Sequence, residues 1–271
     1  MTTCILSVIK NERLYLDFWL SYHLHQGIGH IYLIEDIDSD SHKDITDRYP
    51  NDVTLLSADE VVTEQMMDSI PIMKTKGYSP QNTFFIGGLR RLQSEGKYNW
   101  CFTIDSDEFI TFQSGYDISV VDEFKDYDAV ILQWQNYNAN GLIYTPDYTV
   151  TPITEVYTEV CDDLPSDMVN IFHRCKSCRN LRTFSRNTYL SVHRPNTSVV
   201  KWCKTDFTTD NKIPCYDKVY IRHYITKSLE EYINKINKRG MFHPKHRKIE
   251  DFFTVYNPSM KGLEHMTNQF L

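Results

Sequence analysis

The sequence predicts an α/β protein with a mostly parallel central sheet flanked by helices and a C-terminal helical segment. Short apolar runs alternate with segments of helical periodicity in the first part of the chain, which is the pattern of a parallel sheet. Acidic clusters directly follow two of these runs. Residues 228–239 have a helical pattern that starts at Ser228 and stops before Gly240. Ligands of such sheets bind beyond the carboxyl ends of the strands.

The first half of the chain supplies most of the predicted sheet. Four short apolar runs are expected to be strands, at residues 4–9, 30–34, 53–56 and 100–104. Helices are expected between them, at about residues 16–24, where leucines recur every four positions, and at 43–48 and 81–94. A strand, a helix and a second strand in this order form a right-handed βαβ unit.

The second half has a less regular pattern. Beyond Phe112 we expect strands at residues 129–134 and 149–160, separated by a turn-rich stretch at 136–141, and a strand-like run at 220–224 before the last helix. The sequence contains no internal repeat, low-complexity tract or obvious linker. One continuous domain of 271 residues is therefore expected.

Composition narrows the class of protein. The 29 Lys and Arg against 36 Asp and Glu give a net charge of −7, which argues against a nucleic-acid partner for the molecule as a whole. Basic residues do gather late in the chain, where they form either a solvated face or a patch for phosphates or a peripheral membrane contact. The members of this patch are Lys235, Lys238, Arg239, Lys245, Arg247 and Lys248.

Location and redox state follow from two further features. No stretch approaches the roughly 20 apolar residues of a spanning helix, and the first residues lack the features of a signal peptide. We therefore expect a soluble, cytoplasmic protein. The 7 cysteines are an odd number in a chain that is long enough to fold without disulfides, so reduced thiols are expected.

The motif with the clearest chemistry is Asp105-Ser106-Asp107, directly after the predicted strand at 100–104. In an extended segment residues i and i+2 point the same way, so both carboxylates can converge on one ion. Mn²⁺ and Mg²⁺ prefer carboxylate oxygens and bridge readily to a diphosphate. The motif therefore predicts a Mn²⁺ or Mg²⁺ site that holds a diphosphate, with a solvated acidic turn as the alternative.

Several segments taken in order resemble the GT-A glycosyltransferases related to families 2 and 92. The first group precedes the acidic motif: Lys10-Asn11-Glu12, Phe18-Trp19, Tyr22-His23, Gly27, His30 and the acidic cluster at 36–40. The motif itself, Trp100 with Asp105-Ser106-Asp107-Glu108-Phe109, matches that group's "W…D.DEF" segment. The later matches are Trp134, Asn140-Gly141, Glu155, His223-Tyr224, Thr226-Lys227-Ser228, Glu231, Lys235 and Arg239-Gly240.

The resemblance implies a metal-dependent glycosyltransferase of polysaccharide biosynthesis. Its donor would be a UDP-sugar that carries a hexose, with galactose as one candidate. Its acceptor would be a hydroxyl of a glycan or lipid-linked glycan, attacked with inversion. Residues 1–112 would bind the nucleotide-sugar and residues 113–271 the acceptor. Two alternatives stay open: a non-catalytic binding protein with the GT-A shell, and a sugar-nucleotide nucleotidyltransferase, although residues 7–13 lack the glycine-rich loop expected of the latter.

The resemblance also assigns roles to individual residues. The expected donor-binding residues are Lys10, Asn11, Glu12, Asp36, Gln81, Asp105, Ser106 and Lys227, and the expected metal ligands are Asp105, Asp107 and His223. Lys235 and Arg239 would help Lys227 to neutralise the departing diphosphate. The alternatives are ordinary ones: Glu12 can cap a helix, Gln81 can be a surface amide, and His223 can be a buried, hydrogen-bonded histidine.

The acceptor side is predicted from fewer signals. An inverting transfer needs a base, for which Glu155 is the first candidate and Asp163 the second. Trp134 and Tyr137 offer flat rings on which an acceptor sugar can stack, with core packing as the alternative. The H-x-C-x-x-C pattern of His173, Cys175 and Cys178 can bind zinc, but without a second well-spaced pair we expect reduced, partly buried thiols.

Overall fold

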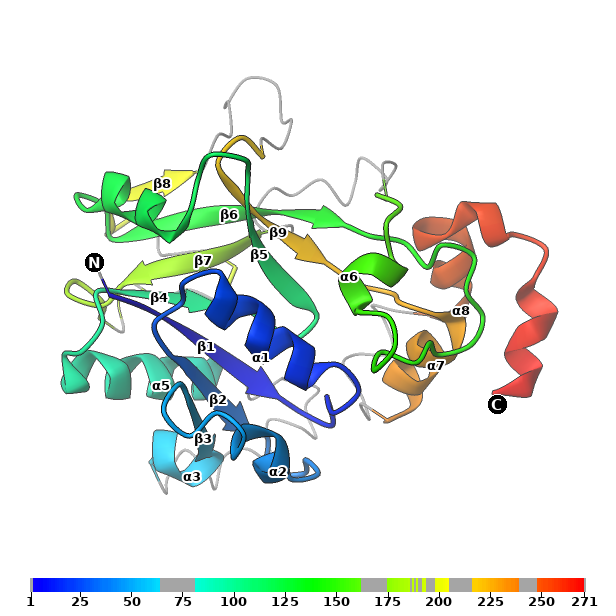
Figure 1. The fold of residues 1–271 in the computed structure, drawn as a ribbon, viewed down its shortest axis with the longest axis horizontal. Coiled ribbons are helices and arrows are strands. Elements are labelled where there is room, and N and C mark those ends of the chain that lie inside the picture. Colours follow the sequence, from blue (N-terminus) through cyan, green and yellow to red (C-terminus); the bar gives the residue numbers. More distant parts are fainter. Residues whose placement is uncertain are drawn as a thin grey trace.

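A computed structural model describes residues 2–63, 81–161, 175–185, 187, 189, 192–193, 198–204, 216–238 and 248–270, with the backbone alone at 202–204 and 238. One sheet of nine strands runs through this part of the chain, in the order β3-β2-β1-β4-β7-β6-β9-β5, with β8 beside β6 (Figure 1). The strands are β1 Thr3–Ile9, β2 Ile31–Glu35, β3 Val53–Ser57, β4 Trp100–Thr103, β5 Glu108–Phe112, β6 Ala129–Asn136, β7 Cys175–Asn180, β8 Trp202–Lys204 and β9 Val219–His223.

The sheet is mostly parallel, as predicted. Strands β1, β2, β3 and β4 pair in parallel, and β6 pairs in parallel with both β8 and β9. Strand β7 pairs antiparallel with both β4 and β6, and β5 pairs antiparallel with β9. The predicted α/β class and the alternation of strands and helices in the first half are confirmed.

Helices cover both faces of the sheet (Figure 1). The helices are α1 Leu16–His25, α2 Lys43–Thr46, α3 Ala58–Val61, α5 Gln81–Glu95, α6 Ile153–Val156, α7 Leu229–Lys238 and α8 Ile249–Asp251. The alternation along β1 explains the two layers: Ile5 packs with Trp19 of α1, whereas Leu6 packs with Phe85 of α5 on the other face. No helix in the described part of the chain is long and apolar enough to cross a bilayer.

The C-terminal helical segment is confirmed and forms its own small core. Helix α7 begins after Ser228, whose hydroxyl and backbone N–H exchange hydrogen bonds with Glu231 in a capping box. Leu229 and Tyr232 of this helix pack against Phe252 and Phe253 from the end of the chain. This packing holds the C-terminal segment beside α7 (Figure 1).

The predicted strand at 149–160 is wrong. The chain there forms the short helix α6, which starts after Pro152, and only residue 160 makes an isolated bridge. Tyr148 and Tyr157 both donate hydrogen bonds to the buried carboxylate of Glu231 on α7. These tertiary contacts override the strand preference of a segment rich in threonine, valine and tyrosine.

Helix α1 protects the open edge of the sheet, where β5 lies. The indole Nε1 of Trp19 donates a hydrogen bond of 2.7 Å to the carbonyl of Glu108, and the amide of Ile110 donates one of 3.1 Å to Nε2 of His23. Burial lowers the pKa of His23 to about 3, so the ring is neutral and can accept. The two side chains complete the edge strand and fix the position of Glu108.

We expect the Trp19→Phe variant to lose about 1–3 kcal/mol of unfolding free energy, because it leaves the buried carbonyl of Glu108 without a donor. Trp134→Phe is the matched control, since no described residue accepts a hydrogen bond from the indole Nε1 of Trp134. Urea unfolding of both variants measures the difference. An equal loss in the two variants would show that ring volume, and not the edge hydrogen bond, matters at Trp19.

Candidate metal centre

The register of three neighbouring strands brings one set of polar side chains together. His223 on β9 lies opposite Glu108 on β5 and opposite Asn136 on β6. Side chains at matched positions of adjacent strands project from the same face of the sheet. Glu108, His223 and Asn136 therefore form a row, and Asp107 lies next to it at the start of β5.

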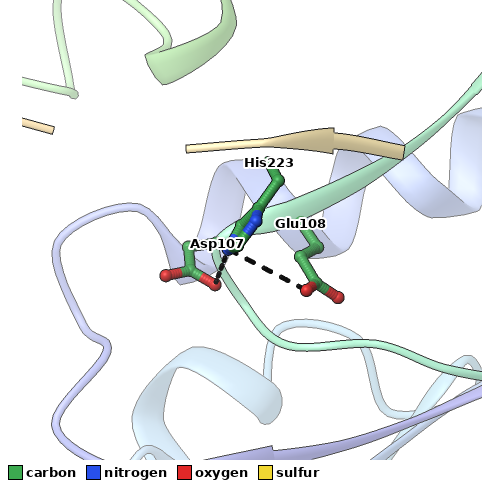
Figure 2. Close-up of side chains that lie close together, drawn as sticks. All are labelled: Asp107, Glu108 and His223. Atoms are coloured by element: carbon green, nitrogen blue, oxygen red, sulfur yellow. Dashed lines mark ion pairs between the residues drawn. The ribbon is translucent and has the colours of Figure 1, made fainter. Parts of the chain in front are cut away.

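Asp107, Glu108 and His223 converge on one point (Figure 2). Their potential ligand atoms all lie within 4.8 Å of one another. His223 Nε2 is 3.9 Å from Asp107 Oδ1 and 4.0 Å from Glu108 Oε1. All three residues are buried, with Glu108 completely inaccessible. Two carboxylates and an imidazole at this spacing can ligate a divalent cation.

The second nitrogen of His223 is held by Asn136. His223 Nδ1 lies 3.0 Å from Asn136 Oδ1, which, as a carbonyl acceptor, places the ring proton on Nδ1. The lone pair of Nε2 then faces the two carboxylates. The ring of Trp134 packs on the imidazole at a centroid distance of 4.2 Å and limits its rotation. Such support of a histidine ligand is usual in metal sites.

The two buried carboxylate oxygens of Glu108 show whether a cation would fit this site. Its Oε2 accepts a hydrogen bond from the amide of Asp105, but no residue in the described part of the chain forms a hydrogen bond with its buried Oε1. Burial raises the pKa of Glu108 well above its usual range, although the ammonium of Lys176 opposes this. A divalent cation bound by Oε1, Asp107 and His223 would satisfy this oxygen. The residues therefore fit a Mn²⁺ or Mg²⁺ ion.

Two lysines neutralise the neighbouring acids. Lys176 on β7, itself buried, lies 2.7 Å from Asp105 Oδ2 and 3.7 Å from Glu108 Oε1. Lys235 on α7 lies 2.6 Å from Asp107 Oδ2. Burial alone would raise the pKa of Asp105, but the Lys176 ammonium outweighs it and holds that pKa below its ordinary value.

Asp105 lies beside the cluster and not in it. Its second carboxylate oxygen accepts a hydrogen bond of 2.8 Å from Gln81, at the start of α5. The i, i+2 interpretation of the motif requires an extended chain between Asp105 and Asp107. The chain instead turns there, and the amide of Glu108 donates a hydrogen bond to the carbonyl of Asp105. The buried Ser106 occupies the turn. The role of Asp105 as a metal ligand stays a prediction.

The expected nucleotide loops follow β1 and β2, at the edge of the sheet where β4 also ends. Asn11 has a positive φ of 54° and bonds to the second loop through Ser39 and Asp40. Lys10 Nζ lies 3.7 Å from Oδ2 of Asp36, whose buried Oδ1 has no hydrogen-bond partner within the described segments. Strands β2 and β4 both run parallel to β1, so their carboxyl ends lie at the same edge of the sheet. Asp36 and Asp105, which follow these two strands, therefore lie at that edge.

Lys227 and Glu12, far apart in the sequence, are joined by Tyr15. Lys227 Nζ donates a hydrogen bond of 2.7 Å to the Tyr15 hydroxyl, which in turn donates to Glu12. Burial, followed by the charges of Glu12 and Asp107, raises the pKa of Tyr15. Lys227 has a positive φ of 57°, a strained conformation typical of functional sites.

The predicted acceptor residues are less closely grouped. Glu155 is exposed on α6 and has no side-chain partner among the described residues. Asp163 lies outside the described residues. Trp134 is partly buried against His223, and Tyr137 is buried with its ring 5.1 Å from that of Tyr224, so the Tyr137 ring is core packing.

The cysteine pattern cannot form one zinc site in this fold. Cys175 and Cys178 are three residues apart on β7, so their side chains project from opposite faces of the strand. Cys175 Sγ lies 3.1 Å from the carbonyl of His193, whereas Cys178 packs in the core on the α1 side. His173 lies outside the described residues.

Asn136 supplies a prediction for the metal centre. We expect Asn136→Leu to weaken Mn²⁺ binding by about 10–100-fold, because the Nδ1 proton of His223 loses its acceptor and the ring loses its orientation. Asn138→Leu, two residues beyond the strand, is the control. Mn²⁺ titration followed by electron paramagnetic resonance measures the affinity, and wild-type affinity in Asn136→Leu would contradict this positioning role.

Comparisons with known proteins show remote likeness alone. No protein-family model matches the sequence, and no curated protein matches it. Two structures of S. aureus TarS are similar at 9% and 11% identity, with TM-scores of 0.41 and 0.44. They overlap 89% and 88% of this chain, which spans 64% and 39% of theirs. The structure of the S. cerevisiae mannosyltransferase Ktr4p in complex with GDP is similar at 13% identity, with a TM-score of 0.30. It overlaps 57% of this chain, which spans 45% of its length.

Proposed function

We propose that the protein is a metal-dependent glycosyltransferase of the GT-A type. It transfers a hexose from a UDP-sugar to a hydroxyl of a glycan or lipid-linked glycan, with inversion. The observation that carries this proposal is the buried cluster of Asp107, Glu108 and His223, in which Oε1 of Glu108 has no hydrogen-bond partner among the described residues. The cluster follows β4, beside the loops that follow β1 and β2.

The residues in and around the cluster would bind different parts of a nucleotide-sugar. Asp107, Glu108 and His223 would hold Mn²⁺ or Mg²⁺, which supplies Lewis-acid neutralisation of a diphosphate when bound. Lys227 and Lys235 add positive charge beside it. Asp36, with its free buried oxygen, accepts hydrogen bonds from the ribose or base. The two ammonium groups would stabilise the negative charge that grows on the diphosphate as it departs.

Transfer with inversion needs one further group, a base on the acceptor side. The acceptor oxygen forms a bond to the anomeric carbon while the bond from that carbon to the diphosphate oxygen breaks. The proton of the acceptor hydroxyl passes to the base, and the electron pair of the broken bond leaves with the diphosphate. Glu155 is our first candidate, because it is an exposed carboxylate with no side-chain partner in the described chain, and Asp163 is the second.

A screen of nucleotide-sugars tests the proposal. UDP-, GDP- and CMP-sugars are added with and without Mn²⁺, and thermal stability and slow donor hydrolysis are measured. We expect stabilisation by a UDP-sugar that requires Mn²⁺. If no nucleotide-sugar stabilises the protein in Mn²⁺ or is hydrolysed, the glycosyltransferase proposal is wrong.

Lys235 gives a prediction with two opposite effects. In Lys235→Met, Mn²⁺ alone should bind about threefold to tenfold more tightly, because no ammonium competes for Asp107. UDP should bind about tenfold more weakly at saturating Mn²⁺, because the diphosphate loses a cation. Isothermal titration calorimetry measures both affinities. The control is Lys43→Met, which removes an exposed lysine paired with Asp47. If the affinities of Lys235→Met for Mn²⁺ and for UDP change in the same direction, the role proposed for Lys235 is wrong.

A further inference from the structure

A second polar site lies on the opposite face of β9 from the metal centre. Arg222 precedes His223, and successive residues of a strand project from opposite faces. In register, Arg222 lies between Phe109 of β5 and Gln135 of β6. Its side chain is partly exposed. The site is therefore separated from Asp107 and Glu108 by the sheet itself.

Aromatic side chains surround Arg222. Ring contacts run from Tyr22 of α1 to Phe109, from Phe109 to Tyr224, and from Tyr224 to Tyr137, with centroid distances of 5.1, 5.4 and 5.1 Å. Burial raises the pKa of Tyr22, Tyr137 and Tyr224, and the charge of Arg222 opposes this in all three. This half-buried guanidinium thus lies among neutral phenols.

The charge of Arg222 is not balanced by a carboxylate. No ion pair joins it to an acid in the described part of the chain, and the groups that favour its charge are Tyr220, Tyr137 and Tyr224. Burial opposes the charge, but the Tyr220 phenol outweighs it, so the pKa of Arg222 is raised and the group stays cationic. Charged side chains are rarely buried without an opposite charge, and the half-buried Arg222 has only neutral phenols beside it among the described residues.

Two buried hydrogen-bond donors at this site also lack acceptors. Among the described residues, the Nε–H of Arg222 and the O–H of Tyr224 have no acceptor, although the Arg222 guanidinium lies close enough to the Tyr224 oxygen to lower the pKa of that phenol. Tyr224 is only 1% exposed. The neighbouring hydroxyls are satisfied, since Tyr22 lies 3.2 Å from Thr111 and Tyr137 donates to Gln135. The site therefore offers N–H and O–H donors to an acceptor that the described residues do not supply.

We propose that Arg222, with the hydroxyls of Tyr220 and Tyr224, binds an anionic group of the phosphate or carboxylate class. A guanidinium presents several N–H donors in a planar fork that matches the oxygens of either anion, and phenols add further O–H donors. The partly exposed side chain of Arg222 provides the entry. This site does not depend on the metal centre or on the activity proposed for it.

The test uses ¹⁵N-arginine-labelled protein and follows the Nε–H resonance of Arg222, which is assigned by its loss in Arg222→Lys. Inorganic phosphate, glucuronate and glucose are titrated separately at constant ionic strength. We expect a saturable shift with phosphate or glucuronate and none with neutral glucose. A response to phosphate alone assigns the site to phosphoryl groups, and a response to glucuronate alone assigns it to carboxylates.

Calorimetry with the anion that responds supplies the second readout. Arg222→Gln should weaken its binding at least tenfold, whereas Arg48→Gln, which removes an exposed arginine paired with Asp17, should not. Asp107→Ala should keep the Arg222 response, so a failure of the metal proposal is distinguishable from a failure here. If neither anion shifts the resonance, if glucose shifts it equally, or if Arg222→Gln binds as wild type does, the site is overturned.

Discussion

Asp107→Ala should abolish Mn²⁺-dependent binding of UDP while the protein remains folded. The variant removes a carboxylate that approaches both His223 and Lys235. The cation would then keep only Glu108 and His223 of the cluster, and a loss of at least 100-fold in UDP affinity is expected. The loss of the ion pair with Lys235 costs stability, but the fold should survive, because Asp107 belongs to none of the hydrophobic core clusters.

The measurement is UDP titration in Mn²⁺ and in a chelator, together with thermal unfolding of both proteins. Asp47→Ala is the control, because it removes an exposed acid whose partner is Lys43. Unchanged UDP affinity of Asp107→Ala in Mn²⁺ would refute the metal centre. A variant that unfolds is replaced by Asp107→Asn, which keeps the shape of the side chain.

Glu155→Gln should bind a UDP-sugar with Mn²⁺ normally yet transfer the sugar about 10²–10⁴-fold more slowly. The reason is that a general base touches the acceptor hydroxyl and not the diphosphate. Glu155 is exposed at the N-terminal turn of α6, where it has no side-chain partner among the described residues. It is thus accessible to an acceptor.

Asp163→Asn tests the second candidate for the base. Glu159→Gln is the matched control, because it changes a nearby exposed acid. Single-turnover transfer is measured for each variant with donor binding checked separately. Near-normal turnover in Glu155→Gln with a slow Asp163→Asn would identify Asp163 as the base. If both variants turn over normally, the base is neither residue.

Periodicity predicted the parallel half of the fold because its strands are short apolar runs separated by helices with regular leucine spacing. It did not predict β7, whose sequence CKSCRN contains the buried Lys176 and Arg179. Such a strand is stable only because residues from distant segments contact its charges, Asp105 for Lys176 and the ring of Tyr189 for Arg179. No local pattern contains that information.

Some residues of the candidate site were predicted from the sequence, and others were not. Asp107 and His223 were predicted from a motif and a resemblance, and the structure brings them together. Glu108 belongs to the same motif, but its approach to His223 depends on the pairing of β5 with β9, which local sequence does not encode. Asn136 and Lys176 are contributed by strands whose register is set by tertiary packing, so the sequence carried no signal for them.

The central claim is that Asp107, Glu108 and His223 bind the cation that holds a nucleotide diphosphate. Anomalous X-ray diffraction from crystals grown with Mn²⁺ and UDP tests it most directly. We predict one anomalous peak within about 2.5 Å of an oxygen of Asp107, Oε1 of Glu108 and Nε2 of His223, with diphosphate oxygens completing the coordination. A nucleotide bound with no anomalous peak at these three residues would contradict the claim.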